Sequence, residues 1–201
     1  MKPILFNTEM VRAILEGRKT VTRRVLKLPS HIQPQDNGLF TLYADGTCYE
    51  NERLVNILQY LKVPYKVGDI LYVRETWIPK ESEENGKLVK GFGYKADFTG
   101  YESMFAWRPS IHMPKEAARI FLRVTDVRVE RLQDITLDDC KKEGVTISEV
   151  ELFCGYNEND KFKVLWNDTI KTDQLKYYSW NDNPYVWVIE FERIEKPAEE
   201  A

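Results

Sequence analysis

The chain has 201 residues, of which 43% are hydrophobic and 30% charged, a composition typical of folded globular proteins that excludes a disordered chain. Its formal net charge of −3 provides no overall positive field, so binding to long duplex DNA is not expected. No apolar run approaches the ~20 residues needed to span a bilayer, and the apolar stretch within residues 1–6 is too short for a signal peptide. We therefore expect a cytoplasmic protein with no membrane partner.

The N-terminal pattern predicts a strand, a helix and a second strand. Residues 1–6 form the first apolar run, and residues 9–16 follow with apolar side chains on one helical face. Gly17 stands where a left-handed helix cap is expected. Residues 18–28 are rich in β-branched side chains, which favours a strand.

The next segment, residues 30–62, has a weaker pattern. Asp45-Gly46 lies between two short apolar runs and predicts a two-residue hairpin turn. Residues 52–61 carry leucine and isoleucine at helical spacing. We interpret this segment as an insertion on a smaller core.

The middle of the chain holds the clearest single element. Residues 70–77 are mostly apolar and predict a buried strand. The charged residues 80–90 predict a solvated loop, residues 91–96 a short strand, and residues 106–114 an ordered aromatic loop.

The C-terminal third contains strands and helices without βαβ alternation. Residues 119–132 alternate as a long strand, with a bulge expected near Thr125-Asp126 because the apolar parity shifts there. Helices are expected over residues 136–143 and 162–170, and a final strand over residues 185–191.

This order of elements predicts the α+β class, with a small β-barrel or curled sheet and helices packed outside it. The sequence contains no internal repeat and no sign of a second core. We expect one domain over residues 1–201, with insertions near 30–62 and 146–158, and the oligomeric state stays open.

Metal and cofactor chemistry find little support in the sequence. Cys48, Cys140 and Cys154 are odd in number and show no C-x-x-C spacing, and His31 and His112 are the two histidines. A zinc site and a disulfide framework are therefore not expected. The chain also has no glycine-rich phosphate loop, so we expect no cofactor and no metal.

Residues 17–24 are the first candidate for a functional site, because Arg18, Lys19, Arg23 and Arg24 make four of these eight residues cationic. Such charge runs are usually solvated faces. However, Lys19 lies at the bend directly after the expected helix cap, and Thr22 follows three residues later. A hydroxyl beside a desolvated lysine amine is a known nucleophile and base combination.

Glu75 is the second candidate, since it follows an apolar strand and lies near the edge of the core. A buried carboxylate needs a partner, for which Lys19, Arg24 and Arg74 are the candidates, and a structural salt bridge is as reasonable as catalysis. Aromatic residues, among them Trp77 and Trp107, mostly belong to the core, although one or two can stack a flat base.

Several sequence blocks together resemble the ASCH domain family, especially its phage- and prophage-encoded members. The blocks are residues 2–6 (KPILF), 14–20 (ILEGRKT), 67–69 (VGD), 73–77 (VRETW) and 107–123. The resemblance implies a PUA-like β-barrel related to RNA-binding domains.

The family signature G-x-K-x-x-E-x-R is matched by Gly17, Lys19 and Arg24, but Thr22 occupies the glutamate position. This departure resembles a small bacterial branch that hydrolyses N4-acetylcytidine through a K-x-x-T pair and a distant glutamate. The resemblance therefore implies Lys19 as base, Thr22 as nucleophile and Glu75 as the third catalytic member.

The leading hypothesis is hydrolysis of the amide on an N4-acylated cytidine-like base, with a modified nucleoside or RNA as partner. It requires a lowered Lys19 pKa, which burial and neighbouring cations favour. The alternatives are a non-catalytic RNA-binding module and a ribonuclease that use the same basic cleft. The expected ligand-binding residues are Arg18, Arg23, Arg24, Arg74, Trp77, Trp107 and His112.

Overall fold

The computed structural model describes residues 1–35, 37–84, 87–100 and 102–197. The chain divides into two compact units, Val25–Pro64 and a larger one formed by Met1–Arg24 with Tyr65–Ala201. The smaller unit covers the segment 30–62 that the sequence marks as an insertion, and the expectation of a single domain stays a prediction.

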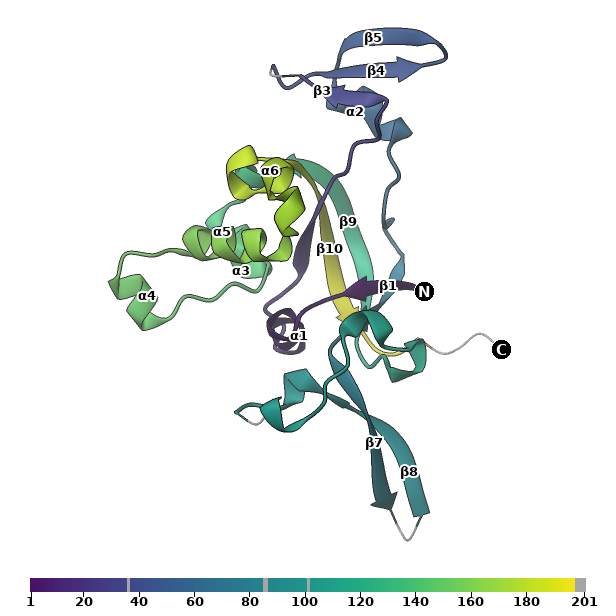
Figure 1. Cartoon of the computed structure of the whole chain (residues 1–201), viewed down its shortest axis with the longest axis vertical. Helices are drawn as coiled ribbons and strands as arrows, with labels where there is room; N and C mark the ends of the chain where they lie inside the picture. The colour runs from purple at the N-terminus through teal and green to yellow at the C-terminus, as the bar shows by residue number, and fades with distance from the viewer. Residues whose placement is uncertain (36, 85–86, 101, 198–201) are drawn as a thin grey trace. The chain divides into compact units, whose positions relative to one another are not determined.

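The larger unit is organised around a five-stranded sheet in the order β1-β6-β9-β10-β2 (Figure 1). Its strands are β1 (Lys2–Leu5), β6 (Ile70–Arg74), β9 (Phe121–Arg131), β10 (Tyr185–Ile194) and β2 (Val21–Val25). β1 pairs with β6 in parallel, whereas β6 with β9 and β9 with β10 pair antiparallel. The α+β class is confirmed. Strand pairing among the described residues shows no closed barrel, so the PUA-like barrel stays a prediction.

β9 and β10 form the longest ladder of this sheet. Val186, Val188 and Ile189 of β10 are fully buried, which explains why this strand reads as a continuous apolar run. The register shifts where Glu190 pairs with Asp126 but the next residue of β10 pairs with Val124. The bulge expected near Thr125-Asp126 is confirmed.

The first helix, α1 (Thr8–Leu15), connects β1 to β2. Asn7 caps it by accepting a hydrogen bond from the backbone N–H of Met10 at 2.9 Å. Gly17 has φ +75°, a left-handed conformation that glycine adopts at low cost. The expected strand over 18–28 is shorter than predicted, because Lys19 first bridges to Glu143 and β2 begins only at Val21.

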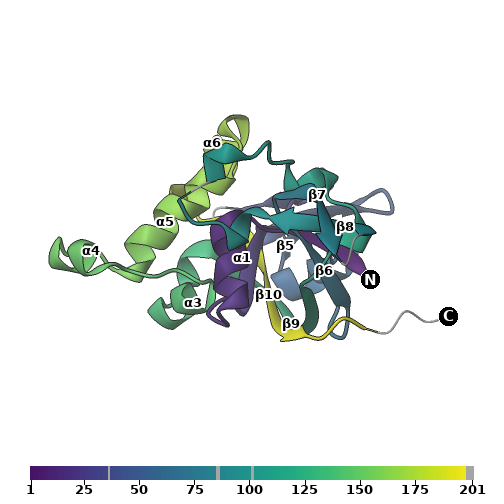
Figure 2. The ribbon, with the colours of Figure 1, turned by 90° about the horizontal axis from the view of Figure 1, so that it is seen from below.

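The remaining helices lie mainly after β9. They are α3 (Leu137–Lys142), α4 (Glu149–Phe153), α5 (Glu158–Thr169) and α6 (Leu175–Tyr178). Each of α3, α4 and α5 begins at a capping box, which explains why short polar sequences form helices here. α3 and α5 pack against each other, and both views place them with α1 on the β10 side of the sheet (Figure 1, Figure 2).

β7 (Trp77–Glu84) and β8 (Lys87–Tyr94) form a separate two-stranded ribbon. The expectation of a solvated loop over 80–90 is wrong for the described residues of that segment, and residues 85–86 lie outside them. Glu81 and Lys90 are direct partners across the ribbon, and a cross-strand pair of opposite charges favours strands even in a polar sequence. The expected strand 70–77 is divided, since β6 ends at Arg74.

The smaller unit contains a three-stranded sheet and one short helix. Its elements are β3 (Ile32–Pro34), β4 (Phe40–Ala44), β5 (Thr47–Glu52) and α2 (Leu54–Ile57). Asp45 and Gly46 both have positive φ, which confirms the two-residue hairpin turn. Phe40, Leu42 and Ile57 are buried and form its core. The helix expected over 52–61 is shorter than predicted and continues as a 3-10 turn.

Short 3-10 turns connect the other elements. They are η1 (Leu58–Tyr60), η2 (Lys95–Asp97), η3 (Glu102–Met104), η4 (Ser110–His112), η5 (Lys115–Ala117), η6 (Leu132–Asp134), η7 (Thr172–Gln174) and η8 (Trp180–Asp182). Within the described part of the chain, no helix has the length and apolarity needed to cross a bilayer.

Candidate functional site

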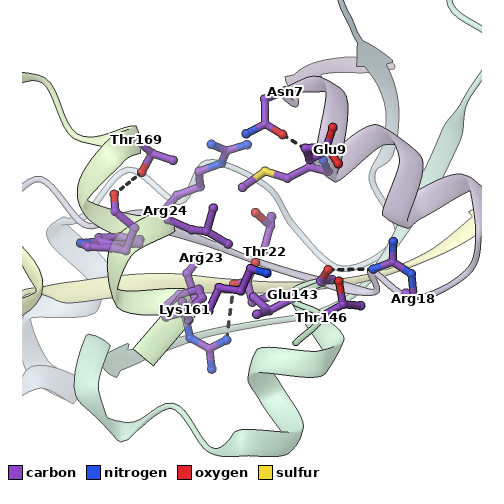
Figure 3. A pocket seen from close by; sticks show the side chains of 16 residues that line it. Asn7, Glu9, Arg18, Thr22, Arg23, Arg24, Glu143, Thr146, Lys161 and Thr169 are labelled. Atoms are coloured by element: carbon purple, nitrogen blue, oxygen red, sulfur yellow. Dashed lines mark hydrogen bonds and ion pairs between the residues drawn. The ribbon is translucent and has the colours of Figure 1, made fainter. Parts of the chain in front are cut away.

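A cavity of about 200 Å³ lies where α1, β2, the segment after α3 and α5 meet (Figure 3). We call it the β2–α5 cavity, and its volume is below the range of about 300–1,000 Å³ typical of ligand pockets. Its lining comprises Asn7, Glu9, Met10, Arg18, Thr22, Arg23, Arg24, Glu143, Gly144, Val145, Thr146, Lys161, Phe162, Leu165, Trp166 and Thr169. Three cations of the segment 17–24, namely Arg18, Arg23 and Arg24, are therefore part of the lining.

Apolar side chains from two helices form one part of the lining. Met10 comes from α1, whereas Phe162, Leu165 and Trp166 come from α5. The rings of Phe162 and Trp166 lie 6.3 Å apart, and the Trp166 indole is fixed by its N–H, which donates to the Tyr178 carbonyl at 2.9 Å. The cavity thus offers aromatic surface whose position is already set.

Lys19 lies next to the cavity, with its side chain fully buried. Its Nζ donates to the Val21 carbonyl at 2.7 Å, the Glu143 carbonyl at 3.0 Å and the Glu143 Oε2 at 2.5 Å. Burial lowers the pKa of Lys19, the Glu143 carboxylate acts to raise it, and Arg24 and Arg23 add to the lowering. Three acceptors around the nitrogen match the three protons of an ammonium group.

Glu143 joins Lys19 to a second buried cation, Arg23. The Arg23 guanidinium lies 3.4 Å from Glu143 Oε1, 3.3 Å from Glu130 and 3.5 Å from Asp139. Its Nε–H is buried and has no hydrogen-bond partner among the described residues. A buried N–H of this kind favours an acceptor from a bound ligand or water.

Arg24 differs from the other cations of the cavity lining. Arg18 pairs with Glu16, Arg23 with Glu143, and Lys161 with Glu151. Arg24 donates to the Leu5 carbonyl at 2.7 Å and lies over the Phe6 ring, but no carboxylate among the described residues is within ion-pair distance of it. Arg24 is therefore the lining cation best placed to meet an anion or carbonyl oxygen of a ligand.

Of the three predicted catalytic residues, Thr22 is the one that lines the cavity, although most of its surface is buried (Figure 3). Lys19 is not among the lining residues, and the described residues show no hydrogen bond between Lys19 and Thr22.

Glu75 has a different partner from those expected. Its two carboxylate oxygens accept from Arg119 at 2.9 and 3.1 Å, and not from Lys19, Arg24 or Arg74. Burial raises the pKa of Glu75, while Arg119 acts to lower it. Glu75 is not among the residues that line the cavity, and its carboxylate pairs with Arg119 rather than with Thr22.

The other predicted ligand-binding residues also lie away from the cavity. Arg74 donates to the Met113 carbonyl, and Trp77 is buried in a core cluster that includes Met113. Trp107 packs against two phenylalanine rings, and His112 is exposed in η4. Of the predicted ligand-binding residues, Arg18, Arg23 and Arg24 line the cavity. Arg74, Trp77, Trp107 and His112 do not line it.

Sequence reasoning missed Glu143 and the aromatic residues of α5. Glu143 stands at the C-terminal end of α3, where the helix dipole disfavours a carboxylate. That conflict is a signal that a cation must be nearby. The apolar spacing of α5 indicated a helix but not what its apolar face lines. No cluster of His, Cys, Asp or Glu suited to a metal ion occurs in the described ranges.

Fold and cavity together define the class: an α+β protein with a small aromatic and cationic pocket beside the edge of an open sheet. No family model and no curated protein matches the sequence. Among solved structures, the chain is similar to protein EF3133 from Enterococcus faecalis V583, of the family DUF984, with 9% identity and a TM-score of 0.45 over all of this chain and 86% of that one. Similarity at this level shows neither family membership nor function, and the ASCH resemblance stays a prediction.

Proposed function

We propose that the protein binds a nucleoside-like ligand, either a modified nucleoside or the corresponding base of an RNA, in the β2–α5 cavity. The observation that carries this proposal is that one cavity is lined both by fixed aromatic side chains of α5 and by Arg24. Arg24 is a cation that forms no ion pair with a described carboxylate.

The two parts of the lining suit the two parts of such a ligand. Flat bases pack on aromatic and apolar surface, as the Phe162, Leu165 and Trp166 side chains provide. Guanidinium groups donate strong hydrogen bonds to carbonyl oxygens and phosphates, and Arg24 is available for this role. The overall negative charge of the protein fits a local site better than a long track for a polyanion.

The contacts of Lys19 favour binding over catalysis. A lysine that activates a hydroxyl must be neutral, with a lone pair directed at that hydroxyl. Here all three Nζ protons have acceptors, and one of these is a carboxylate. In this arrangement Lys19 is an ammonium group that holds Glu143 in place.

Amide hydrolysis is the second candidate function, and the position of Thr22 in the cavity lining is what favours it. The Thr22 Oγ would attack the acyl carbon, the C–N4 bond would break, and the amine would leave after taking up a proton. Water would then cleave the ester and release the acid, regenerating the hydroxyl. Lys19 would have to lose its proton first, a step that its burial favours.

Binding is tested by calorimetric titration of the protein with cytidine, N4-acetylcytidine and a short single-stranded RNA. Arg24→Met should weaken binding about 10- to 100-fold, the range expected for loss of a charged hydrogen bond. Arg123→Met is the matched control, because Arg123 is exposed and pairs with Glu192 on the surface. Absence of binding by the intact protein, or equal affinity of the Arg24 variant, would contradict the proposal.

Hydrolysis is tested by measuring acetate and cytidine released from N4-acetylcytidine. Thr22→Ala should abolish any release, while Thr20→Ala, at an exposed neighbouring position, should leave it unchanged. Release that persists in the Thr22 variant eliminates this residue as the nucleophile. If the intact protein binds the compound without turnover, the binding function stands alone.

A further inference from the structure

We infer that Glu143 accepts a hydrogen bond from the ligand and so makes the cavity prefer bases that carry an amino group over bases with an oxo group at the same position. This inference rests on the proposed nucleoside-binding function and assigns Glu143 as a residue that determines specificity.

Glu143 combines deep burial with access to the cavity. Its side chain is 5% exposed, yet it is part of the cavity lining, and Figure 3 shows it close to Thr22. Glu9, the other carboxylate of the lining, is 78% exposed and pairs with Arg12. Among the described lining residues, Glu143 is therefore the carboxylate that is shielded from solvent.

The Glu143 carboxylate can accept further hydrogen bonds. Oε2 accepts from Lys19 at 2.5 Å, and Oε1 lies 3.4 Å from Arg23. Each carboxylate oxygen has two lone-pair sites, so each can accept another hydrogen bond. The two cations stabilise the charged form of a group that would be costly to bury alone.

The position of Glu143 is fixed by the backbone as well as by its side chain. Residues Lys19 and Glu143 form an antiparallel bridge, and the Lys19 Nζ also holds the Glu143 carbonyl. Gly144 follows with φ +90° and packs against Ala13 and Lys19 so closely that a Cβ there would lie 2.7 Å from the Ala13 Cβ. An acceptor held this firmly can discriminate between ligands.

The chemical consequence is selectivity by hydrogen-bond polarity. A carboxylate accepts from the exocyclic amino group of cytosine, but it opposes an oxo group, which offers only lone pairs. The other charged groups that face the cavity from β2 and α5 are donors, namely Arg23, Arg24 and Lys161. These donors can bind the ring carbonyl that cytosine and its oxo analogue share. The difference in affinity between the amino base and the oxo base is therefore assigned to Glu143.

The test compares cytidine with uridine, which differ by an amino against an oxo group on the same ring. Affinities are measured by calorimetry for the intact protein, Glu143→Gln and Glu130→Gln. The intact protein should prefer cytidine about 10- to 100-fold. Glu143→Gln should reduce this preference to near equality, because an amide can both donate and accept.

Glu130→Gln is the matched control, since Glu130 contacts the same Arg23 guanidinium but does not line the cavity. It should retain the preference of the intact protein. If Glu143→Gln does not fold, Glu143→Asp replaces it, and the shorter side chain should weaken cytidine binding more than uridine binding.

The outcomes separate this inference from the proposed function. If the intact protein binds neither nucleoside, the nucleoside-binding function fails. If it binds both equally, or if the Glu143 variant keeps the preference for cytidine, the role of Glu143 is overturned while nucleoside binding stands.

Discussion

The Lys19–Glu143 ion pair joins two residues that are 124 positions apart in the chain, with side chains 0% and 5% exposed. Burying either charge alone would be costly, so the pair is stable only when both partners and their hydrogen bonds are present. Removing one partner therefore leaves the other charge buried without its counter-charge.

Replacing Lys19 with methionine should lower the free energy of unfolding by about 3 kcal/mol, because Glu143 stays buried with Arg23 as its remaining cation. Lys2→Met provides the control, since the side chains of the Lys2–Asp69 pair are 47% and 24% exposed and the loss of this pair should cost at most about 1 kcal/mol. Guanidinium denaturation of both variants measures the difference. Equal losses would show that the buried pair has no special role.

Among the elements, the junction after α3 holds Glu143 against Lys19. α3 is followed by a left-handed glycine, Gly144, which lies close to Ala13 of α1 and to Lys19. A side chain at this position meets two obstacles: an unfavourable φ and the Ala13 side chain.

Gly144→Ala should destabilise the protein by about 3 kcal/mol, the sum of a left-handed backbone cost and an overpacking cost. Gly155→Ala separates the two causes, because Gly155 has a similar φ of +83° but open space around it, and should cost about 1 kcal/mol. Thermal unfolding of both variants measures the two losses. If Gly155→Ala costs as much as Gly144→Ala, the close contact with Ala13 has no energetic weight.

At the scale of the whole molecule, the chain consists of two compact units with different degrees of burial. The larger unit contains β10, which pairs on both sides and is buried over Val186–Ile189. In contrast, β5 of the smaller unit is exposed and lies at a sheet edge. Local opening requires little free energy where few apolar contacts are lost.

Hydrogen exchange followed by mass spectrometry should therefore show slow exchange for Val186–Ile189 and fast exchange for Thr47–Glu52. The amides of β9 that pair with β10 should share the slow rate. Protection of β5 equal to that of β10 would mean that the two units open together as one cooperative structure.

Local sequence determined much of the secondary structure of this protein. The α1 helix with its Gly17 cap, the Asp45-Gly46 turn and the start of α3 at Thr136 all follow from interactions between residues a few positions apart. The shift of apolar parity near Thr125-Asp126 indicated the bulge, although the bulge itself forms against the distant strand β10. The loop expected over 80–90 is wrong, because the pairing of β7 with β8 across the ribbon outweighs the polar composition of each strand.

Tertiary structure alone decided which charged residues meet. Composition and spacing identified Lys19, Thr22 and Glu75 as unusual, but Arg119 is the partner of Glu75 and Glu143 that of Lys19. A single sequence shows that a buried charge needs a partner without showing which one, since every distant opposite charge satisfies the same rule. Only the pairing of β2 beside β10, with the end of α3 bridged to Lys19, brings Glu143 to the cavity.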